Sequence, residues 1–327
     1  MAHLVAGFGS SHSPMLAARV EDWQQGAFLR RDMARQLVDF DGVSCRYEDV
    51  LARAPADAAA LIAVDALAQR HAQAQAAILR LRDDIASMKL DALIVVGDDQ
   101  EELFDHTNMP AIGLYHGDTI RNARRAPATD PLDVAMMRLR EDERDVEYPC
   151  DADLARHLIG ALGEDGFDLS VMRGLPPDRA EGHAYSWVHR FCMGVDPIPI
   201  VPVFLNAYYP PNQPSPARCH GLGEALARGI ASCPGDRRIG IFASGGLSHF
   251  VVDAPFDHAV IDALRRKDAA FLRTAPLHKL QSGSSEIRNW ICLGGAVSSL
   301  DMAWVTYVPG YRTPALTGTG LCFASFH

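Results

Sequence analysis

The sequence lacks three features: an apolar run long enough to cross a membrane, a cluster of basic residues, and a Cys-x-x-Cys pair. The first absence argues against a transmembrane helix. The net charge of −10, with no Lys/Arg cluster, argues against broad binding to nucleic acid or to anionic membranes. We therefore expect neither a nucleic acid nor a membrane as a partner.

Cysteine is scarce, odd in number and scattered along the chain. The seven are Cys45, Cys150, Cys192, Cys219, Cys233, Cys292 and Cys322. Reduced thiols explain this distribution better than a disulfide framework or a thiolate metal site. The first residues also lack the positive region and the cleavage site of a signal peptide. We expect a soluble cytoplasmic protein.

The composition is that of a folded protein. With 327 residues and 48% hydrophobic residues, the chain has ample material for a core, which excludes global disorder. Predicted helices and strands alternate throughout, and we find no repeat, linker or low-complexity tract. This order favours one α/β domain over residues 1–327, with a central mixed, largely parallel sheet flanked by helices.

Hydrophobic periodicity predicts the individual elements. Strands are expected over 4–9, 91–97, 108–115, 168–173, 198–205, 239–244 and 304–308. Helices are expected over 58–89, 131–140, 151–162, 217–232 and 258–273, with another starting at Glu286. Prolines interrupt the strand 198–205, so we expect it to lie near a sheet edge or to be only partly paired. The Gly/Thr-rich residues after 308 are predicted to be turns.

The first strand runs into a short loop, Ser11-His12-Ser13-Pro14. Pro14 discourages an immediate helix, so His12 should stand on stiff backbone at the carboxyl end of the strand. Ligands of open α/β sheets gather at that end. His12 is therefore a candidate metal ligand, although a single hydrogen bond at a strand terminus would also explain a histidine there.

Other polar groups follow the same logic. Asp98-Asp99-Gln100 and His249 come after two further strands, and His183 and Glu286 lie where helices begin. Imidazole and carboxylate groups on a rigid scaffold, with open positions left over, suit non-haem Fe(II). Glu286 could instead be first-turn charge favouring the helix dipole, and Gln100 could simply cap a loop. His71 lies on an apolar helix stripe and is expected to pack.

Taken together, these motifs identify a family resemblance. The matching pieces are Ser11-His12-Ser13-Pro14, the strand before Asp98-Asp99-Gln100, Gly182-His183, Asn206-Ala207, Gly245-Gly246-Leu247-Ser248-His249 and Glu286-Ile287-Arg288-Asn289-Trp290. In kind and order they resemble the class III extradiol ring-cleavage dioxygenases, the family of protocatechuate 4,5-dioxygenase catalytic subunits. Within that family, the branch acting on methylgallate and lignin-derived catechols is the nearer match. The motifs span nearly the whole chain.

The resemblance implies a metal site and an acid–base group. His12 and Glu286 match two ligands of Fe(II), His183 matches the acid–base histidine, and His249 is expected to orient the substrate or another side chain. Gln100 stands where the family usually has its second histidine ligand. An amide oxygen can bind iron, so Gln100 is taken as the third ligand. Asp98, Asp99 and His106 are the alternatives.

The resemblance also implies the reaction, which is Fe(II)-dependent extradiol cleavage of a substituted, carboxylated catechol by O₂. Tyr185, Asn206 and Tyr208 are candidate substrate-binding residues, although Tyr208 could equally pack under its proline-rich loop. Arg288 and Arg121 are candidate partners for the substrate's negative charge. A homodimer or larger homo-oligomer is expected. The alternatives are a metal-binding protein without oxygenase activity and a metal-dependent hydrolase on the same scaffold.

Overall fold

The computed structural model describes residues 1–23, 27–124, 127–139 and 144–327. The strands are β1 (His3–Ser10), β2 (Leu37–Val38), β3 (Ser44–Cys45), β4 (Ala92–Asp98), β5 (Ile112–Tyr115), β6 (Thr119–Asn122), β7 (Val146–Pro149), β8 (Ser170–Met172), β9 (Ile200–Leu205), β10 (Arg238–Ser244), β11 (His249–Val251), β12 (Met302–Tyr311) and β13 (Thr317–Phe326). The α-helices are α1 (Pro14–Ala17), α2 (Ala27–Ala34), α3 (Tyr47–Leu51), α4 (Ala58–Leu61), α5 (Val64–Ser87), α6 (Pro131–Met137), α7 (Ala152–Glu164), α8 (His183–Trp187), α9 (Pro216–Ser232), α10 (Ala254–Arg266), α11 (Ala269–Arg273) and α12 (Ile287–Ala296).

Within the described residues, nine strands form one sheet in the order β11-β13-β1-β10-β4-β9-β5-β8, with β12 paired to β13. The central strands β1, β10, β4 and β9 run parallel to one another. On either side of them the pairing becomes antiparallel, between β1 and β13 and between β9 and β5. This confirms the predicted α/β domain with a mixed, largely parallel central sheet.

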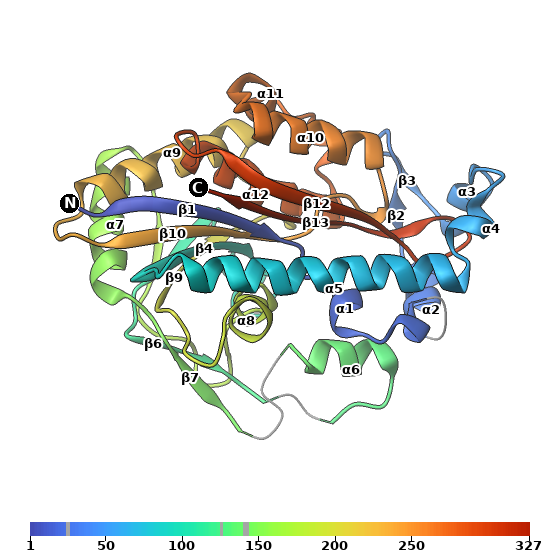
Figure 1. Ribbon diagram of the computed structural model, residues 1–327, viewed down its shortest axis with the longest axis horizontal. Helices are drawn as coiled ribbons and strands as arrows, with labels where there is room; N and C mark the ends of the chain where they lie inside the picture. The colour runs from blue at the N-terminus through green and yellow to red at the C-terminus, as the bar shows by residue number, and fades with distance from the viewer. Residues whose placement is uncertain (24–26, 125–126, 140–143) are drawn as a thin grey trace.

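Helices cover both faces of this sheet, with α5 and α8 on one face and α9 and α12 on the other (Figure 1). Strand β4 shows why its sequence is continuously apolar. Ile94 and Val96 enter the core under α9 and α12, while Leu93 and Val95 enter the core under α5. Side chains of a strand alternate between faces, so a strand covered on both sides needs apolar residues at every position.

Two predictions about strands need correction. Strand β9 does not lie at an edge, since it pairs with β4 over its whole length, but on its other side it is only partly paired, which was the alternative. Pro202 is tolerated there because the pairing with β5 on the other side begins only at Val203. The residues after 308 are not turns either. Thr317–Phe326 form β13, whose ten residues are all buried between β1 and β12.

Several helix predictions need smaller corrections. The helix expected over 58–89 is split into α4 and α5, and the one expected over 258–273 is split into α10 and α11, where Lys267 adopts a left-handed conformation with φ of 56°. Helix α6 ends at Met137, and residue 140 of its predicted range lies outside the described residues. The hairpin of β6 and β7 was not predicted.

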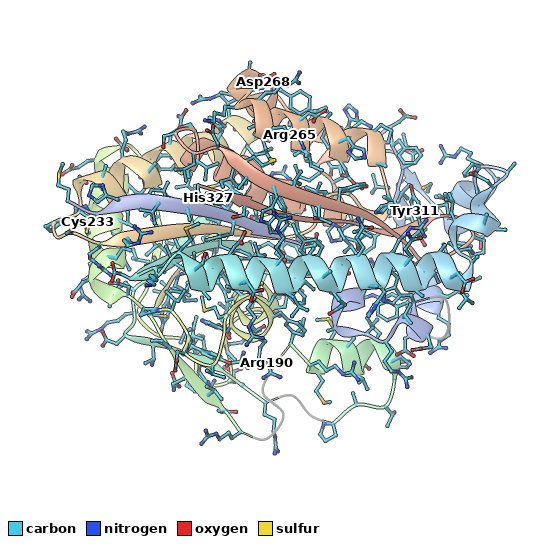
Figure 2. The ribbon with its side chains drawn as sticks, viewed as in Figure 1. Arg190, Cys233, Arg265, Asp268, Tyr311 and His327 are labelled. Carbon is cyan, nitrogen blue, oxygen red and sulfur yellow. The ribbon has the colours of Figure 1, made fainter. Side chains whose placement is uncertain are left out.

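Among the described residues, no helix combines the length and the apolar composition that a bilayer span requires. The outer faces of the helices carry charged groups, such as Arg265 on α10 (Figure 2). All seven cysteines are free, as the sequence suggested. His71 packs as predicted, with its ring edge-to-face against Trp23 at a centroid distance of 5.4 Å.

Helices α9 and α12 touch backbone to backbone, and this contact fixes the start of α12. A Cβ added at Gly223 would collide with the carbonyl oxygen of Cys292, and one added at Gly295 would collide with that of His220. Only glycine permits this approach, because the obstacle is rigid backbone. The two glycines therefore set the position from which Glu286, just before α12, enters the site.

We expect Gly223→Ala to lower the free energy of unfolding by about 1–3 kcal/mol, the usual cost of overpacking a rigid contact. Gly221→Ala is the matched control, since it lies on the same helix with nothing within 4 Å of its added Cβ. That variant should be neutral or slightly stabilising, because alanine favours the helix. Urea denaturation measures both. Equal stabilities for the two variants would contradict the close contact.

Candidate metal centre and active site

Three parallel strands deliver polar side chains to the same edge of the sheet. His12 follows β1, while Ser244 and Asp98 are the last residues of β10 and β4, which are neighbours in the sheet. His12 Nε2 lies 3.8 Å from Asp98 Oδ1, and both side chains are almost completely buried. The predicted convergence of polar groups at the carboxyl ends of the strands is therefore observed.

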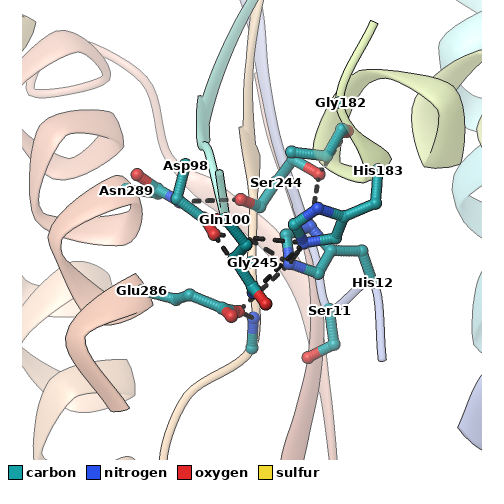
Figure 3. Close-up of polar contacts among 12 residues, drawn as sticks. Ser11, His12, Asp98, Gln100, Gly182, His183, Ser244, Gly245, Glu286 and Asn289 are labelled. Carbon is teal, nitrogen blue, oxygen red and sulfur yellow. Dashed lines mark hydrogen bonds and ion pairs between the residues drawn. The ribbon is translucent and has the colours of Figure 1, made fainter. Parts of the chain in front are cut away.

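The ring of His12 is held by Ser244. The Ser244 hydroxyl donates to the carbonyl of Ala184 at 2.7 Å, so its oxygen is left to accept from His12 Nδ1 at 3.0 Å. His12 Nδ1 therefore carries the proton, and the lone pair of Nε2 points into the site (Figure 3). A hydrogen bond to the remote ring nitrogen is the usual way in which proteins orient a metal-binding histidine.

His183, the first residue of α8, is held in the same way by Glu102. The carboxylate of Glu102 accepts from His183 Nδ1 at 2.6 Å and from its backbone N–H. His183 Nε2 then lies 3.2 Å from His12 Nε2 (Figure 3) and 3.9 Å from Asp98 Oδ2. Ligand atoms of His12, Asp98 and His183 all lie within 4.8 Å of one another. Two imidazole nitrogens and a carboxylate thus converge on one point.

Glu286 lies beside this group, next to His12. Its Oε2 lies 3.2 Å from His12 Nε2 and accepts the backbone N–H of Gly246 at 2.7 Å. Its Oε1 accepts the hydroxyl of Tyr208 at 2.6 Å. The carboxylate is therefore fixed by two donors and is almost completely buried. The donor set of two imidazoles and two carboxylates fits a divalent transition metal.

Burial and neighbouring charges shift the pKa values of the side chains in this cluster. Burial and the charge of Glu286 raise the pKa of Asp98 to about 6. Burial alone would lower the pKa of His183, but the charge and hydrogen bond of Glu102 outweigh it and raise that pKa to about 10. Burial would raise the pKa of Glu286, but His249 and His12 lower it. The surrounding carboxylates therefore favour the charged form of His183.

The alternatives for the third ligand lie in different surroundings. Gln100 lines the cavity, and its Nε2 lies 3.4 Å from His183 Nε2 and 3.5 Å from Asp98 Oδ2. Asp99 instead accepts the backbone N–H groups of Leu103 and Phe104 and so shapes the following loop. His106 is exposed. Only Asp98 and Gln100, of these candidates, stand beside the two histidines.

His249 stands on the other side of Glu286. Its Nδ1 lies 2.8 Å from the carbonyl of Leu247, and its Nε2 lies 3.4 Å from Glu286 Oε2. Since a carbonyl only accepts, Nδ1 carries a proton and Nε2 is the nitrogen that faces the site. This arrangement serves both states of the ring, because a second proton on Nε2 would lie beside a carboxylate.

The three candidate substrate residues occupy unlike positions. Tyr208 lines the cavity and holds Glu286. The hydroxyl of Tyr185 instead donates to the carbonyl of Val203 beneath the site, where the ring is fully buried. Asn206 bonds the backbone of Tyr209 and shapes its own loop. Neither of these two side chains lines the cavity, so we do not carry them into the proposed site.

A cavity that is open to solvent lies above this cluster. Its lining comprises His12, Ser13, Pro14, Phe28, Arg31, Arg35, Gln100, Leu132, Met136, His183, Tyr208, His249, Phe250, Glu286, Arg312 and Thr319. This mixture of aromatic, aliphatic and polar side chains suits a small aromatic ligand. The arginines suggested by the sequence are not among these residues. Arg288 is buried against the carbonyls of Pro214 and Leu280, and Arg121 bonds the carbonyls of Pro177 and Arg179.

Sequence reasoning missed the residues that hold the ligands. These include Ser244, Glu102 and Asn289, whose Nδ2 donates to Asp98 Oδ1 at 3.3 Å and to the carbonyl of Ser244 at 2.8 Å. A weak signal existed for Asn289, which lies within a motif of the resemblance, and for Ser244, which directly precedes one. Glu102 had none, because its partner His183 is 81 residues away.

Comparison with known proteins agrees with this geometry. Residues 61–321 match the family model described as the catalytic LigB subunit of aromatic ring-opening dioxygenase. The chain belongs to the LigB family. The resemblance inferred from the motifs is therefore confirmed. The matched segment includes Asp98, His183, His249 and Glu286, while His12 precedes it and joins these LigB residues through the fold.

Individual LigB-type relatives match over shorter stretches. Gallate dioxygenase of Pseudomonas putida is 31% identical over 163 residues, which is 45% of this chain and 46% of that protein. The 2,3-dihydroxyphenylpropionate/2,3-dihydroxicinnamic acid 1,2-dioxygenase of Comamonas testosteroni is 28% identical over 175 residues, 53% of this chain and 47% of that protein. The enzyme of the same name from Paraburkholderia phymatum is 43% identical over 101 residues, 31% of this chain and 30% of that protein. In the first two comparisons the chain spans about half the length of the relative.

Proposed function

We propose that this protein is an Fe(II)-dependent dioxygenase that opens the ring of a substituted, carboxylated catechol by extradiol cleavage with O₂. The observation that carries the proposal is the convergence of His12 Nε2, His183 Nε2 and buried carboxylates at one side of an open cavity. Two histidines and a carboxylate with open positions are typical of non-haem iron oxygenases. Membership of the LigB family and the dioxygenase names of its relatives support the same reaction.

The geometry favours a ligand set of His12, His183 and Glu286. His183, rather than Gln100, would be the second ligand beside His12. Its Nε2 lies 3.2 Å from that of His12, and its Nδ1 is hydrogen-bonded to Glu102. This assignment departs from the acid–base role that the resemblance implied for His183. When bound, Fe(II) would supply Lewis acidity to the catechol hydroxyls and a position for O₂.

Two carboxylates compete for the third position, and we favour Glu286. Its charge is maintained by Tyr208, by the N–H of Gly246 and by the neighbouring histidines, whereas burial raises the pKa of Asp98 to about 6. Asp98 also lies farther from His12 Nε2, at 3.8 Å against 3.2 Å for Glu286. Asp98 and Gln100 would then border the open positions.

His249 is placed to move protons during the reaction. Its Nε2 faces the cavity and can accept a proton from a catechol hydroxyl, while Nδ1 stays on the carbonyl of Leu247. The resulting imidazolium would be stabilised by Glu286 at 3.4 Å and could return the proton during ring opening. The hydroxyl of Tyr208 donates to Glu286 and so holds this carboxylate in position.

The proposal is tested by loading the protein with Fe(II) under argon, adding 3,4-dihydroxybenzoate and admitting O₂. We expect one O₂ to be consumed per catechol and the absorbance of a ring-opened semialdehyde to appear, with neither change in the metal-free protein. A hydrolase would release product from an ester substrate without O₂. A metal-binding protein without oxygenase activity would bind iron and show no O₂ uptake. Either result would overturn the proposal.

We expect His249→Phe to retain iron and to turn over at least ~100-fold more slowly, because general acid–base catalysis contributes about that factor or more. Iron content after anaerobic desalting and the rate of O₂ uptake measure the two effects. His258→Phe is the control, since His258 is exposed and packs edge-to-face on Tyr307 outside the cavity. Equal rates for His249→Phe and the wild type would remove His249 from proton transfer.

The cytoplasmic location and the homo-oligomeric assembly are further proposals. Seven free cysteines support a reducing compartment. The assembly rests on the resemblance alone.

A further inference from the structure

A second group of charged side chains lines the cavity that holds the metal cluster. It consists of Arg31, Arg35 and Arg312. Arg312 is neutralised, since its Nε and Nη2 each donate to a carboxylate oxygen of Asp32 at 2.6 Å. Thr317 also donates to Asp32, at 2.8 Å. The carboxylate of Asp32 is therefore fully engaged, and it does not form an ion pair with either of the other two arginines.

Arg35 differs from Arg312, because its guanidinium has no ion pair or hydrogen bond within the described residues. Its central carbon lies over the ring of Phe250, 3.6 Å from the ring centroid. The side chain is only partly exposed. Stacking uses the face of a guanidinium and leaves its N–H edge for a ligand. Arg35 is thus oriented and has donors to spare.

Phe250 connects this cation to the catalytic end of the cavity. It directly follows His249, and its φ of 64° lies in the left-handed region, which costs energy for a residue with a side chain. This conformation places the Phe250 ring under Arg35, while His249 Nε2 faces Glu286. The cation is therefore held in a fixed relation to the metal cluster.

The charge of Arg35 is not compensated locally. Burial and the charge of Arg31 lower its pKa to about 10, against the opposing effect of Asp32. Arg35 is still fully charged at neutral pH, but in a place where a positive charge is unfavourable. A bound anion would remove this penalty and gain charge-assisted hydrogen bonds.

We propose that Arg35 binds the carboxylate of the substrate and so makes the enzyme selective for catechols that carry a planar anionic group. This inference deepens the proposed function and rests on it. The planar N–H edge of arginine matches the two oxygens of a carboxylate. With the catechol hydroxyls at His12, His183 and Glu286, the ring lies between the metal cluster and the cation. Arg31, exposed at the mouth of the cavity, adds attraction for the incoming anion.

The test compares two ligands that share the catechol ring, 3,4-dihydroxybenzoate and its uncharged methyl ester. Binding to the Fe(II)-loaded protein is measured by calorimetry under argon, so that no turnover is required. Arg35→Gln should weaken binding of the acid at least ~10-fold, as expected for the loss of a charge-assisted hydrogen bond, and should leave binding of the ester within about twofold. Arg30→Gln is the matched control, because Arg30 lies on α2, the helix that ends just before Arg35, bonds Asp130 and does not line the cavity.

The outcomes separate the alternatives. Equal losses for acid and ester in Arg35→Gln would mean that Arg35 only maintains the cavity, which overturns the proposal. Equal losses of the acid in Arg35→Gln and Arg30→Gln would mean that only net charge matters, which also overturns it. If the wild type binds the acid through Arg35 but does not cleave it, the oxygenase assignment fails while the anion site stands.

Discussion

Replacing His12 with alanine is expected to abolish iron retention in a protein that stays folded. His12 is the residue nearest to every other donor, with 3.2 Å to both His183 Nε2 and Glu286 Oε2 and 3.8 Å to Asp98 Oδ1. Loss of a group that merely orients a ligand costs about 10–100-fold in metal affinity, so loss of this ligand should exceed ~100-fold. Glu286→Ala should have an effect of the same order.

Iron per chain after anaerobic desalting, together with circular dichroism, measures this prediction. His71→Ala is the control, since His71 packs on Trp23 away from the site. Asp98→Asn distinguishes the two carboxylates, and we expect it to retain iron with reduced affinity. Stoichiometric iron in either His12→Ala or Glu286→Ala would remove that residue from the ligand set. Loss of iron in Asp98→Asn but not in Glu286→Ala would mean that Asp98, and not Glu286, is the third ligand.

The second large effect is expected at His183. We predict that His183→Ala weakens iron binding by more than ~100-fold, while Gln100→Leu keeps affinity within about tenfold of the wild type. The reason is that His183 Nε2 is aimed at the cluster by Glu102, whereas Gln100 is exposed and faces the cluster from its rim. Glu102→Gln should fall between the two, since it loosens the orientation of the ring and leaves the ligand in place.

Iron dissociation constants from competition with a chelator decide this point. Iron retained by His183→Ala, with at least ~100-fold slower ring cleavage, would return His183 to the acid–base role suggested by the resemblance. Iron lost from Gln100→Leu would show that the amide oxygen completes the ligand set. Iron affinity and cleavage rate are measured separately, so the loss of a ligand can be distinguished from the loss of an acid–base group.

The sequence was most informative where a strand ends in a polar loop. The strands before His12 and Asp98 were placed to within about two residues, and their parallel pairing through β10 explains why the two side chains meet. The sequence did not reveal that β13 completes the sheet, because glycine and threonine are typical of turns. There they occupy a strand packed so tightly that a Cβ at Gly318 would strike the backbone of Gly310.

The candidate site was predicted as a set of residues but not as a set of contacts. His12, His183, Glu286 and His249 were named from motifs, and the structure brings all four together. The role of each histidine depends on which of its ring nitrogens is already hydrogen-bonded. The partners of these nitrogens are Ser244, Glu102 and the carbonyl of Leu247. Arg35 could not be found by pattern, because its significance lies in the absence of a partner within the described fold.

The most direct test of the central claim is a crystal structure of the Fe(II)-loaded protein, prepared anaerobically with 3,4-dihydroxybenzoate and with anomalous data collected at the iron edge. The account predicts one iron bound by His12 Nε2, His183 Nε2 and Glu286, with both catechol oxygens on the metal and His249 beside the ring. Iron bound by Gln100 with His183 free, or iron outside this cluster altogether, would contradict it.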